Sequence, residues 1–274
     1  MRILVSTDIE GVAGVFHAEQ TRPGNGEYER ARAWMTGEAN AAAQGAFAGG
    51  ATEVLVNDSH GGFRNLLPDQ IDERVRLVLG KPRTLGMMAG LEAGCDAVML
   101  IGYHSRAQGR GVLAHTINSR AFARVAINGM ELGEAGLYGA LAGELGVPVI
   151  LGSGDDAFIE ETAPLFPGAR WVQVKTAGGH GSGASLSPSA ARRAIAEAAE
   201  AAVRAAAAER PVPLRIPGPI ECRLQTQGPA LADLFCLWPA LEREDGVTLR
   251  FTAGSVQDAV RMLNSLSAMS FMLR

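Results

Sequence analysis

The chain has 274 residues, of which 47% are hydrophobic and 20% charged, so it can bury a sizeable core and is not intrinsically disordered. A formal net charge of −4, without a long basic segment, argues against nucleic acid as the main partner. The longest apolar runs are too short to span a membrane, and the first ends at Asp8, which argues against a signal peptide. Three cysteines without Cys-x-x-Cys spacing predict reduced thiols in a cytoplasmic protein and no sulfur metal site.

The first predicted strand, residues 2–7, is followed by two carboxylates. Side chains two positions apart on an extended chain point the same way, so Asp8 and Glu10 face one spot. Ligands of open α/β sheets bind at the carboxyl ends of the strands. Two like charges held close together need a cation or a proton between them. Taken alone, the pair is also compatible with a capping Asp and a solvated Glu.

The segment up to residue 102 alternates strands with helices, as expected for a parallel sheet. A glycine-rich loop, residues 11–26, leads into a helix that begins at Glu27 and stops at Gly49-Gly50. Further strands are predicted at residues 53–57, 75–79 and 96–102, and a short helix at 84–94. The last strand is apolar almost throughout, which is typical of a strand buried on both faces.

Polar side chains follow three of these strands at the point where each strand ends. Asp8 and Glu10 follow the first, Asp58 and His60 the second, and His104 the strand at 96–102. The carboxyl ends of parallel strands share one edge of the sheet, so these groups are expected to converge. Carboxylate and imidazole are ligands of Zn²⁺, and the sequence therefore predicts a metal site at this edge.

The next segment begins with a hairpin signal at Asn128-Gly129. A helix follows over residues 133–146, with Glu134 in its first turn, where the helix dipole alone would also favour a carboxylate. Strands are predicted at 147–152 and 171–175, and Asp155 or Asp156 is interpreted as a helix cap. The glycine-rich segment 178–183 is predicted to be a loop, with His180 outside the metal site. Ser187-Pro188 then starts a long alanine-rich helix that ends near Arg210.

A proline-rich stretch from Pro211 to Pro219 divides the chain into residues 1–210 and a smaller α+β portion, 211–274. Strands are predicted there at 214–216, 220–226 and 247–252, with a last helix starting at Ser255. The expected fold is an α/β fold, with a mostly parallel sheet flanked by helices and this smaller C-terminal α+β portion.

The motifs in chain order resemble the M55 peptidase family, the DppA-like zinc-dependent D-aminopeptidases. They are Asp8-x-Glu10-Gly11, Asn57-Asp58-Ser59-His60, Gly102-Tyr103-His104, His115 and Gly133-Glu134, with further agreement at Tyr28-Glu29-Arg30, Met35-Thr36-x-Glu38-Ala39-Asn40, Glu53 to Asn57 and Leu186-Ser187-Pro188. The resemblance covers essentially the whole chain.

The resemblance implies a site with two zinc ions per subunit and Asp8 bridging them. It assigns Glu10 and His104 to one metal and His60 and Glu134 to the other. His115 matches the position proposed for the family's catalytic nucleophile. The resemblance also implies a ring-like homodecamer and short peptide substrates with an N-terminal D-residue, such as D-Ala-D-Ala.

The chemistry of these residues is compatible with that assignment but leaves alternatives open. Mn²⁺ or Co²⁺ also fits oxygen and imidazole ligands. His115 is compatible with a general base, a transition-state donor or a covalent nucleophile. A two-metal phosphoester hydrolase or another amide hydrolase is a second reading, and a non-catalytic peptide-binding ring a third.

Overall fold

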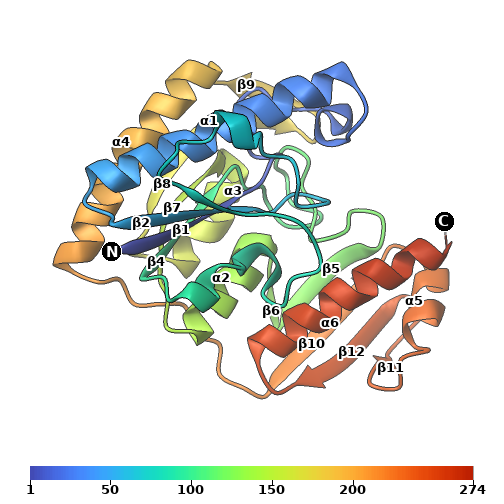
Figure 1. Cartoon of the computed structure of the whole chain (residues 1–274). Helices are drawn as coiled ribbons and strands as arrows, with labels where there is room; N and C mark the ends of the chain where they lie inside the picture. Colours follow the sequence, from blue (N-terminus) through green and yellow to red (C-terminus); the bar gives the residue numbers. More distant parts are fainter. Residues whose placement is uncertain (274) are drawn as a thin grey trace.

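A seven-stranded sheet forms the centre of the molecule, which the computed structural model describes over residues 1–273 (Figure 1). Its strand order is β3-β2-β1-β4-β7-β8-β9, and every neighbouring pair is parallel except β8 with β9. This confirms the mostly parallel sheet expected from the sequence. The strands are β1 (Arg2–Thr7), β2 (Glu53–Asp58), β3 (Arg76–Val78), β4 (Ala97–Ile101), β7 (Val149–Asp155), β8 (Arg170–Gly179) and β9 (Ser182–Ser185).

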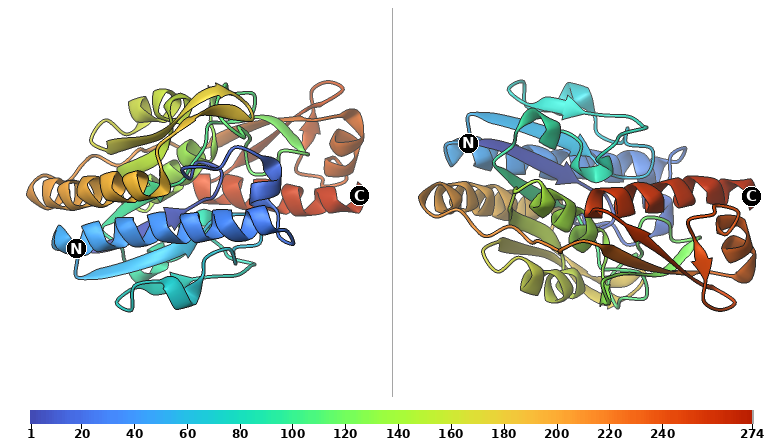
Figure 2. Two further views of the ribbon diagram at one scale, coloured as in Figure 1. Left: turned by 90° about the horizontal axis from the view of Figure 1, so that it is seen from above. Right: turned by 90° about the horizontal axis from the view of Figure 1, so that it is seen from below.

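Helices cover both faces of this sheet, which is why its central strands are apolar throughout. The alanine-rich helices α1 (Gly26–Ala48) and α4 (Pro188–Ala208) pack against each other on one face (Figure 2). Helix α2 (Glu134–Glu144) packs on the other face beside α6 (Val256–Met269). Alternate residues of β1 face opposite layers: Ile3 and Val5 belong to the core under α1 and α4, and Leu4 to the core under α2 and α6.

A second, antiparallel sheet of order β11-β12-β10-β5-β6 extends the molecule toward the C-terminus. Its strands β5 (Phe122–Ile127) and β6 (Met130–Glu131) form the expected hairpin, in which Asn128 and Gly129 both have positive φ. Residues on both sides of the expected 210/211 boundary thus share one sheet, and the division into two domains stays a prediction. The remaining elements are β10 (Ile220–Thr226), β11 (Glu242–Arg243), β12 (Thr248–Ala253), α3 (Asp156–Thr162), α5 (Pro229–Phe235) and the 3-10 helices η1 (Ala18–Thr21), η2 (Pro68–Gln70), η3 (Gly86–Met88), η4 (Leu91–Ala93), η5 (Ala163–Leu165) and η6 (Ser270–Leu273).

Three local predictions were wrong. The single helix expected at 84–94 is the pair η3 and η4, interrupted at Gly90, whose φ of 109° is incompatible with a right-handed helix. Residues 214–216 form no strand, because the flanking prolines lack the N–H groups that a ladder needs. The expected loop at 178–183 is largely the β8–β9 hairpin, paired from Lys175 with Ser185 to Gly179 with Ser182.

Within residues 1–273, none of the helices combines the length and the apolar character required to cross a bilayer.

Candidate metal centre

The six side chains singled out in the sequence lie together at the carboxyl edge of the central sheet. Asp8 and Glu10 follow β1, His60 follows β2, His104 follows β4, His115 lies in the loop after β4, and Glu134 is the first residue of α2. The loops carrying them are packed so closely that a Cβ at Gly11 would collide with the carbonyl group of Tyr103. Only glycine can therefore occupy that position behind Glu10.

Asp8 lies between two histidines. His60 Nδ1 is 3.2 Å from Asp8 Oδ1 and 3.0 Å from Glu10 Oε2. His104 Nε2 is 3.5 Å from Asp8 Oδ2 and 3.7 Å from Glu134 Oε1. Glu134 Oε1 is also 3.7 Å from His115 Nε2. The carboxylate of Asp8 thus connects the two sides of the cluster.

All three histidines are oriented by backbone carbonyl groups. His60 Nε2 lies 2.9 Å from Thr21 O, His104 Nδ1 2.9 Å from Ser105 O, and His115 Nδ1 2.9 Å from Leu113 O. A carbonyl oxygen only accepts, so these ring nitrogens carry the protons. In a neutral ring the other nitrogen then presents its lone pair to the carboxylates, which is the arrangement that ligating histidines use.

Among residues 1–273, two buried atoms of the cluster find no hydrogen-bond partner: Glu10 Oε2 and His104 Nε2. His60 Nδ1 lies 3.0 Å from Glu10 Oε2 without forming a hydrogen bond with it. Asp8, Glu10, His104 and Glu134 are each 5% exposed or less. Leaving such groups unsatisfied is costly, and a cation bound between them would remove the cost. The donor set therefore fits a divalent metal.

The charge balance of the cluster supports the same conclusion. Burial would lower the pKa of His60 and His104, but the adjoining carboxylates outweigh it and raise both well above the ordinary value. Burial would raise the pKa of Glu10 and Glu134, but the histidines outweigh it and lower both. The carboxylates are thus stabilised by nearby positive charge. Protons on the histidines or a bound metal ion can provide it, and the two compete for the same histidine nitrogens.

Ligand atoms lie close enough for shared coordination in two sets. Asp8, Glu10 and His104 form one set, and His104, His115 and Glu134 the other, with the atoms of each set within 4.8 Å of one another. The first set contains the ligands that the resemblance assigns to one zinc. His60 lies nearest to Asp8 and Glu10 rather than to Glu134, with which the resemblance pairs it. The assignment of each ligand to a metal stays a prediction.

Asp58, the remaining carboxylate of the strand-end pattern, does not join the cluster. Its oxygens accept hydrogen bonds from the backbone N–H groups of Asn65 (2.5 Å) and Leu66 (2.8 Å) and from the Asn65 side chain (2.8 Å). Asp58 therefore shapes the loop that carries His60.

Two buried charged residues behind Glu10 were not recognised as site residues from the sequence. Lys175 Nζ, on β8, donates to the carbonyl groups of Glu10 (2.5 Å) and Val15 (2.8 Å). Glu38 Oε1, on α1, accepts from the Ala13 N–H (2.9 Å). Together they fix the loop that follows β1. Glu38 belongs to the motif Met35 to Asn40, but no local sequence pattern indicates that it lies near Lys175, 137 residues later.

The loop with His115 is fixed from the opposite side. Asp155 accepts a hydrogen bond from Val112 N (2.7 Å) and also caps α3 through Phe158 N (2.7 Å), which confirms its predicted role as a cap. The Leu113 N–H donates to the His180 carbonyl group at the tip of the β8–β9 hairpin (2.8 Å). The hairpin thus supports the loop through its backbone.

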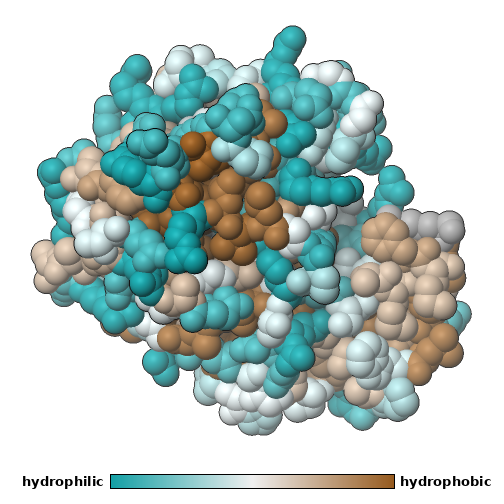
Figure 3. Space-filling model, in the orientation of Figure 1, coloured by the Kyte–Doolittle hydropathy of each residue, from teal (hydrophilic) through white to brown (hydrophobic). Residues whose placement is uncertain are grey.

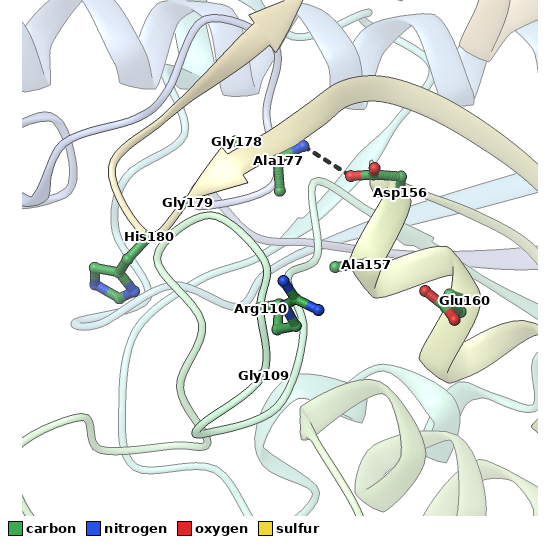
Figure 4. A pocket seen from close by; sticks show the side chains of 9 residues that line it. All are labelled: Gly109, Arg110, Asp156, Ala157, Glu160, Ala177, Gly178, Gly179 and His180. Carbon is green, nitrogen blue, oxygen red and sulfur yellow. Dashed lines mark hydrogen bonds between the residues drawn. The ribbon is translucent and has the colours of Figure 1, made fainter.

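A cavity of about 430 Å³ lies beside this loop and is distinct from the carboxylate–histidine cluster (Figure 4). It is formed by the loop after β4, by α3 and by the β8–β9 hairpin. No member of the cluster lines it; the lining residues are Gly109, Arg110, Asp156, Ala157, Glu160, Ala177, Gly178, Gly179 and His180.

Comparisons with known proteins agree with this geometry. A curated D-aminopeptidase from Bacillus subtilis (strain 168) is 35% identical over 199 residues, which is 72% of each chain. The solved structure described as "Zn-dependent D-aminopeptidase DppA from Bacillus subtilis, a self-compartmentalizing protease" superposes with a TM-score of 0.94 at 29% identity, over 99% of this chain and 98% of that one. The family model described as "Peptidase_M55: D-aminopeptidase" matches residues 1–265. The chain therefore belongs to the M55 peptidase family of D-aminopeptidases.

Proposed function

We propose that this protein is a zinc-dependent aminopeptidase that hydrolyses short peptides with an N-terminal D-amino acid, of the D-Ala-D-Ala type, at a two-zinc site. The observation that carries the proposal is the position of the Asp8 carboxylate, with His60 at 3.2 Å on one side and His104 at 3.5 Å on the other. A carboxylate with one oxygen toward each histidine can serve two metals at once. The family's named activity supplies the reaction class.

Each residue of the cluster has a defined task under this proposal. Asp8 would serve both metals, Glu10 and His104 would hold one of them, and His60 and Glu134 the other, as the family resemblance implies. Zinc, when bound, supplies Lewis acidity for the scissile carbonyl group and for a water nucleophile, and Mn²⁺ or Co²⁺ fits the same donors. The three carboxylates also favour binding of a cationic peptide amine.

We propose that His115 is a catalytic residue and not a metal ligand. Its side chain is 17% exposed, whereas that of His104 is 1% exposed, so His115 lies where a substrate can reach it. The Leu113 carbonyl group holds the proton on Nδ1 and leaves Nε2 to take up a proton or attack the substrate.

The decisive experiment compares hydrolysis of D-Ala-D-Ala and L-Ala-L-Ala by chelator-stripped protein, before and after zinc is returned. We expect zinc-dependent cleavage of the D-peptide alone. Cleavage of a phosphoester instead would favour the two-metal phosphoesterase. Tight binding of the dipeptide without turnover would favour the peptide-binding ring. Cleavage of both peptides at equal rates would contradict D-specificity.

We further propose that the chain self-assembles into a homodecameric ring, in line with the self-compartmentalizing description of the structural relative. An apolar patch on the C-terminal portion supports this: Leu237, Trp238, Phe271, Met272 and Leu273 are all exposed where α5 packs against η6 (Figure 3). Patches of this kind mark protein–protein contacts. Analytical ultracentrifugation of the native protein and of Leu237→Asp tests the assembly. A decamer that dissociates in the variant is expected, and a native monomer would contradict it.

The three cysteines, Cys95, Cys222 and Cys236, are all free, which supports placing this protein in the reducing cytoplasm.

A further inference from the structure

The segment after β3 carries a cation that the chemistry described above does not use. Lys81 is exposed over much of its surface, and within residues 1–273 its ammonium group has no hydrogen-bond or ion-pair partner. It lies over the ring of Phe63, with Nζ 4.3 Å from the ring centroid. An aromatic face attracts a cation but leaves its N–H groups free to donate to another ligand.

Lys81 is held against the metal-centre loop by a short chain of contacts. The Phe63 N–H donates to the His60 carbonyl group (2.8 Å), and the Phe63 carbonyl group accepts from Gly80 N (2.6 Å). Gly80, the residue before Lys81, is therefore linked to His60 through the backbone of Phe63. This places the ammonium group at the carboxyl edge of the sheet, on the side of β2.

A second cation increases the positive potential at this point. The Arg83 guanidinium lies 3.9 Å from the centroid of the same Phe63 ring. It donates to Asn57 Oδ1 (2.9 Å), Asp58 O (2.5 Å) and Val78 O (3.3 Å), which are all uncharged acceptors. Two neighbouring cations whose hydrogen bonds go only to uncharged acceptors favour the binding of an anion, although the carboxylates of Asp58 and Glu92 also act on Arg83.

The electrostatics connect this site with the metal centre. Neighbouring protein atoms that partly shield the ammonium group from water, together with the charge of Arg83, lower the pKa of Lys81, while the carboxylate of Glu134 acts to raise it. Lys81 therefore lies within electrostatic range of a metal-centre carboxylate, yet the two are not paired. A short peptide zwitterion has the complementary layout, with a cationic amine at one end and a carboxylate at the other.

We propose that Lys81, supported by Arg83, binds the C-terminal carboxylate of the peptide substrate and thereby selects short peptides. The inference rests on the proposed function, in which the amine end of the peptide lies at the carboxylate–histidine cluster. Lys81 is then a specificity-determining residue. Arg83, whose nitrogens hold Asn57 and the β2 backbone, is a positioning residue.

The test is the discrimination between D-Ala-D-Ala and D-Ala-D-Ala amide, which lacks the carboxylate. The zinc-loaded native enzyme is expected to prefer the free acid. In Lys81→Gln we expect KM for the free acid to rise about 10- to 100-fold, the range of a charge-assisted hydrogen bond, with kcat/KM for the amide unchanged. Lys81→Arg should restore part of the preference. Arg193→Gln, an exposed cation on α4, controls for net charge and should leave the preference intact.

Binding to the chelator-stripped protein, measured by calorimetry, separates this inference from the proposed function because no turnover is needed. Suppose that the native protein binds the free acid more tightly than the amide and that Lys81→Gln loses this preference. That result would support the carboxylate site even if the zinc enzyme cleaved neither peptide. Equal binding of acid and amide by the native protein, or equal loss of both in the variant, would overturn it even in an active D-aminopeptidase. Melting temperatures of all variants confirm that they are folded.

Discussion

The imidazole rings of His104 and His115 lie stacked, with their centroids 4.1 Å apart and their planes inclined by 10°. Both rings direct Nε2 toward Glu134, at 3.7 Å in each case. The buried ring of His104, which we propose as a metal ligand, thus lies parallel to the partly exposed ring of His115, which we propose as a catalytic group. The stack also fixes the His115 ring plane, so that little rotational freedom has to be lost when substrate binds.

We therefore predict that His115→Ala retains its zinc and lowers kcat about 10²- to 10⁴-fold, the range typical of a positioned acid–base group. Zinc content by mass spectrometry and steady-state kinetics check the two parts separately. His17→Asn, which replaces an exposed histidine with another good helix cap, is the matched control. Loss of one equivalent of zinc in His115→Ala would instead identify His115 as a ligand, since it also belongs to a metal-compatible set.

Asp8 and Asp58 offer a second comparison, because both are buried carboxylates at the ends of adjacent strands. Asp8→Asn should lose both metals and all zinc-dependent turnover, since the bridging carboxylate becomes a neutral amide. Asp58→Asn should keep its zinc, because an amide oxygen can still accept from Asn65 or Leu66. Zinc content of the two purified variants decides the matter. Full metal in Asp8→Asn would remove the bridging role.

Where the relevant signal was local, the sequence predicted that the site residues would lie together, and their role as metal ligands stays a prediction. Asp8 and Glu10 lie one and three residues after β1, although the chain bends and turns there instead of staying extended. His60 and His104 lie two and three residues after their strands, and Glu134 begins α2. The parallel sheet then brings residues such as His60 and His104 to one edge without further information. The Asn128-Gly129 hairpin was likewise predicted by two adjacent residues.

Features that depend on distant contacts were not predictable in this way. The turn at Gly90 breaks an otherwise helix-like segment, because the segment packs beneath β1, with Leu4 beside it. The contribution of β5 to a sheet with β10 depends on the pairing of Cys222 with Ile127, 95 positions apart in sequence. Lys175 lies on β8, three places from β1 in the strand order, and donates a hydrogen bond to the Glu10 carbonyl group. A single sequence contains no periodic signal for such pairs.

The link from Lys175 to Glu10 leads to a prediction about metal affinity. Lys175→Met leaves the carbonyl groups of Glu10 and Val15 without their donor, so the loop that presents Glu10 loses its anchor. We expect zinc affinity to fall about 10- to 100-fold, as is usual when a group that orients a ligand is removed. Gln173→Met, at an exposed position of the same strand, is the control. Competition with a chromophoric chelator measures the affinity, and equal values for the two variants would contradict the role of Lys175.

Glu38 leads to a prediction about pH and stability. Its side chain is fully buried, its Oε2 has no hydrogen-bond partner in the part of the chain that the structure describes, and burial raises its pKa from 4.5 to about 7. Because the folded state holds this proton more tightly than the unfolded state, the associated stability is complete below pH 4.5 and is lost as the pH rises through about 7. Above that range the charged carboxylate costs up to about 3 kcal/mol, by the conversion of about 1.4 kcal/mol per pKa unit.

Glu38→Gln removes this ionisation while keeping an oxygen to accept from Ala13 N. The stability of the variant relative to the native protein should therefore increase between pH 4.5 and pH 8, and the two should differ least at the acidic end. Urea unfolding of the chelator-stripped proteins at a series of pH values measures this difference without interference from metal binding. Parallel stability profiles across that range would mean that Glu38 titrates normally, and that its unpartnered oxygen carries a charge compensated by another group such as Lys175.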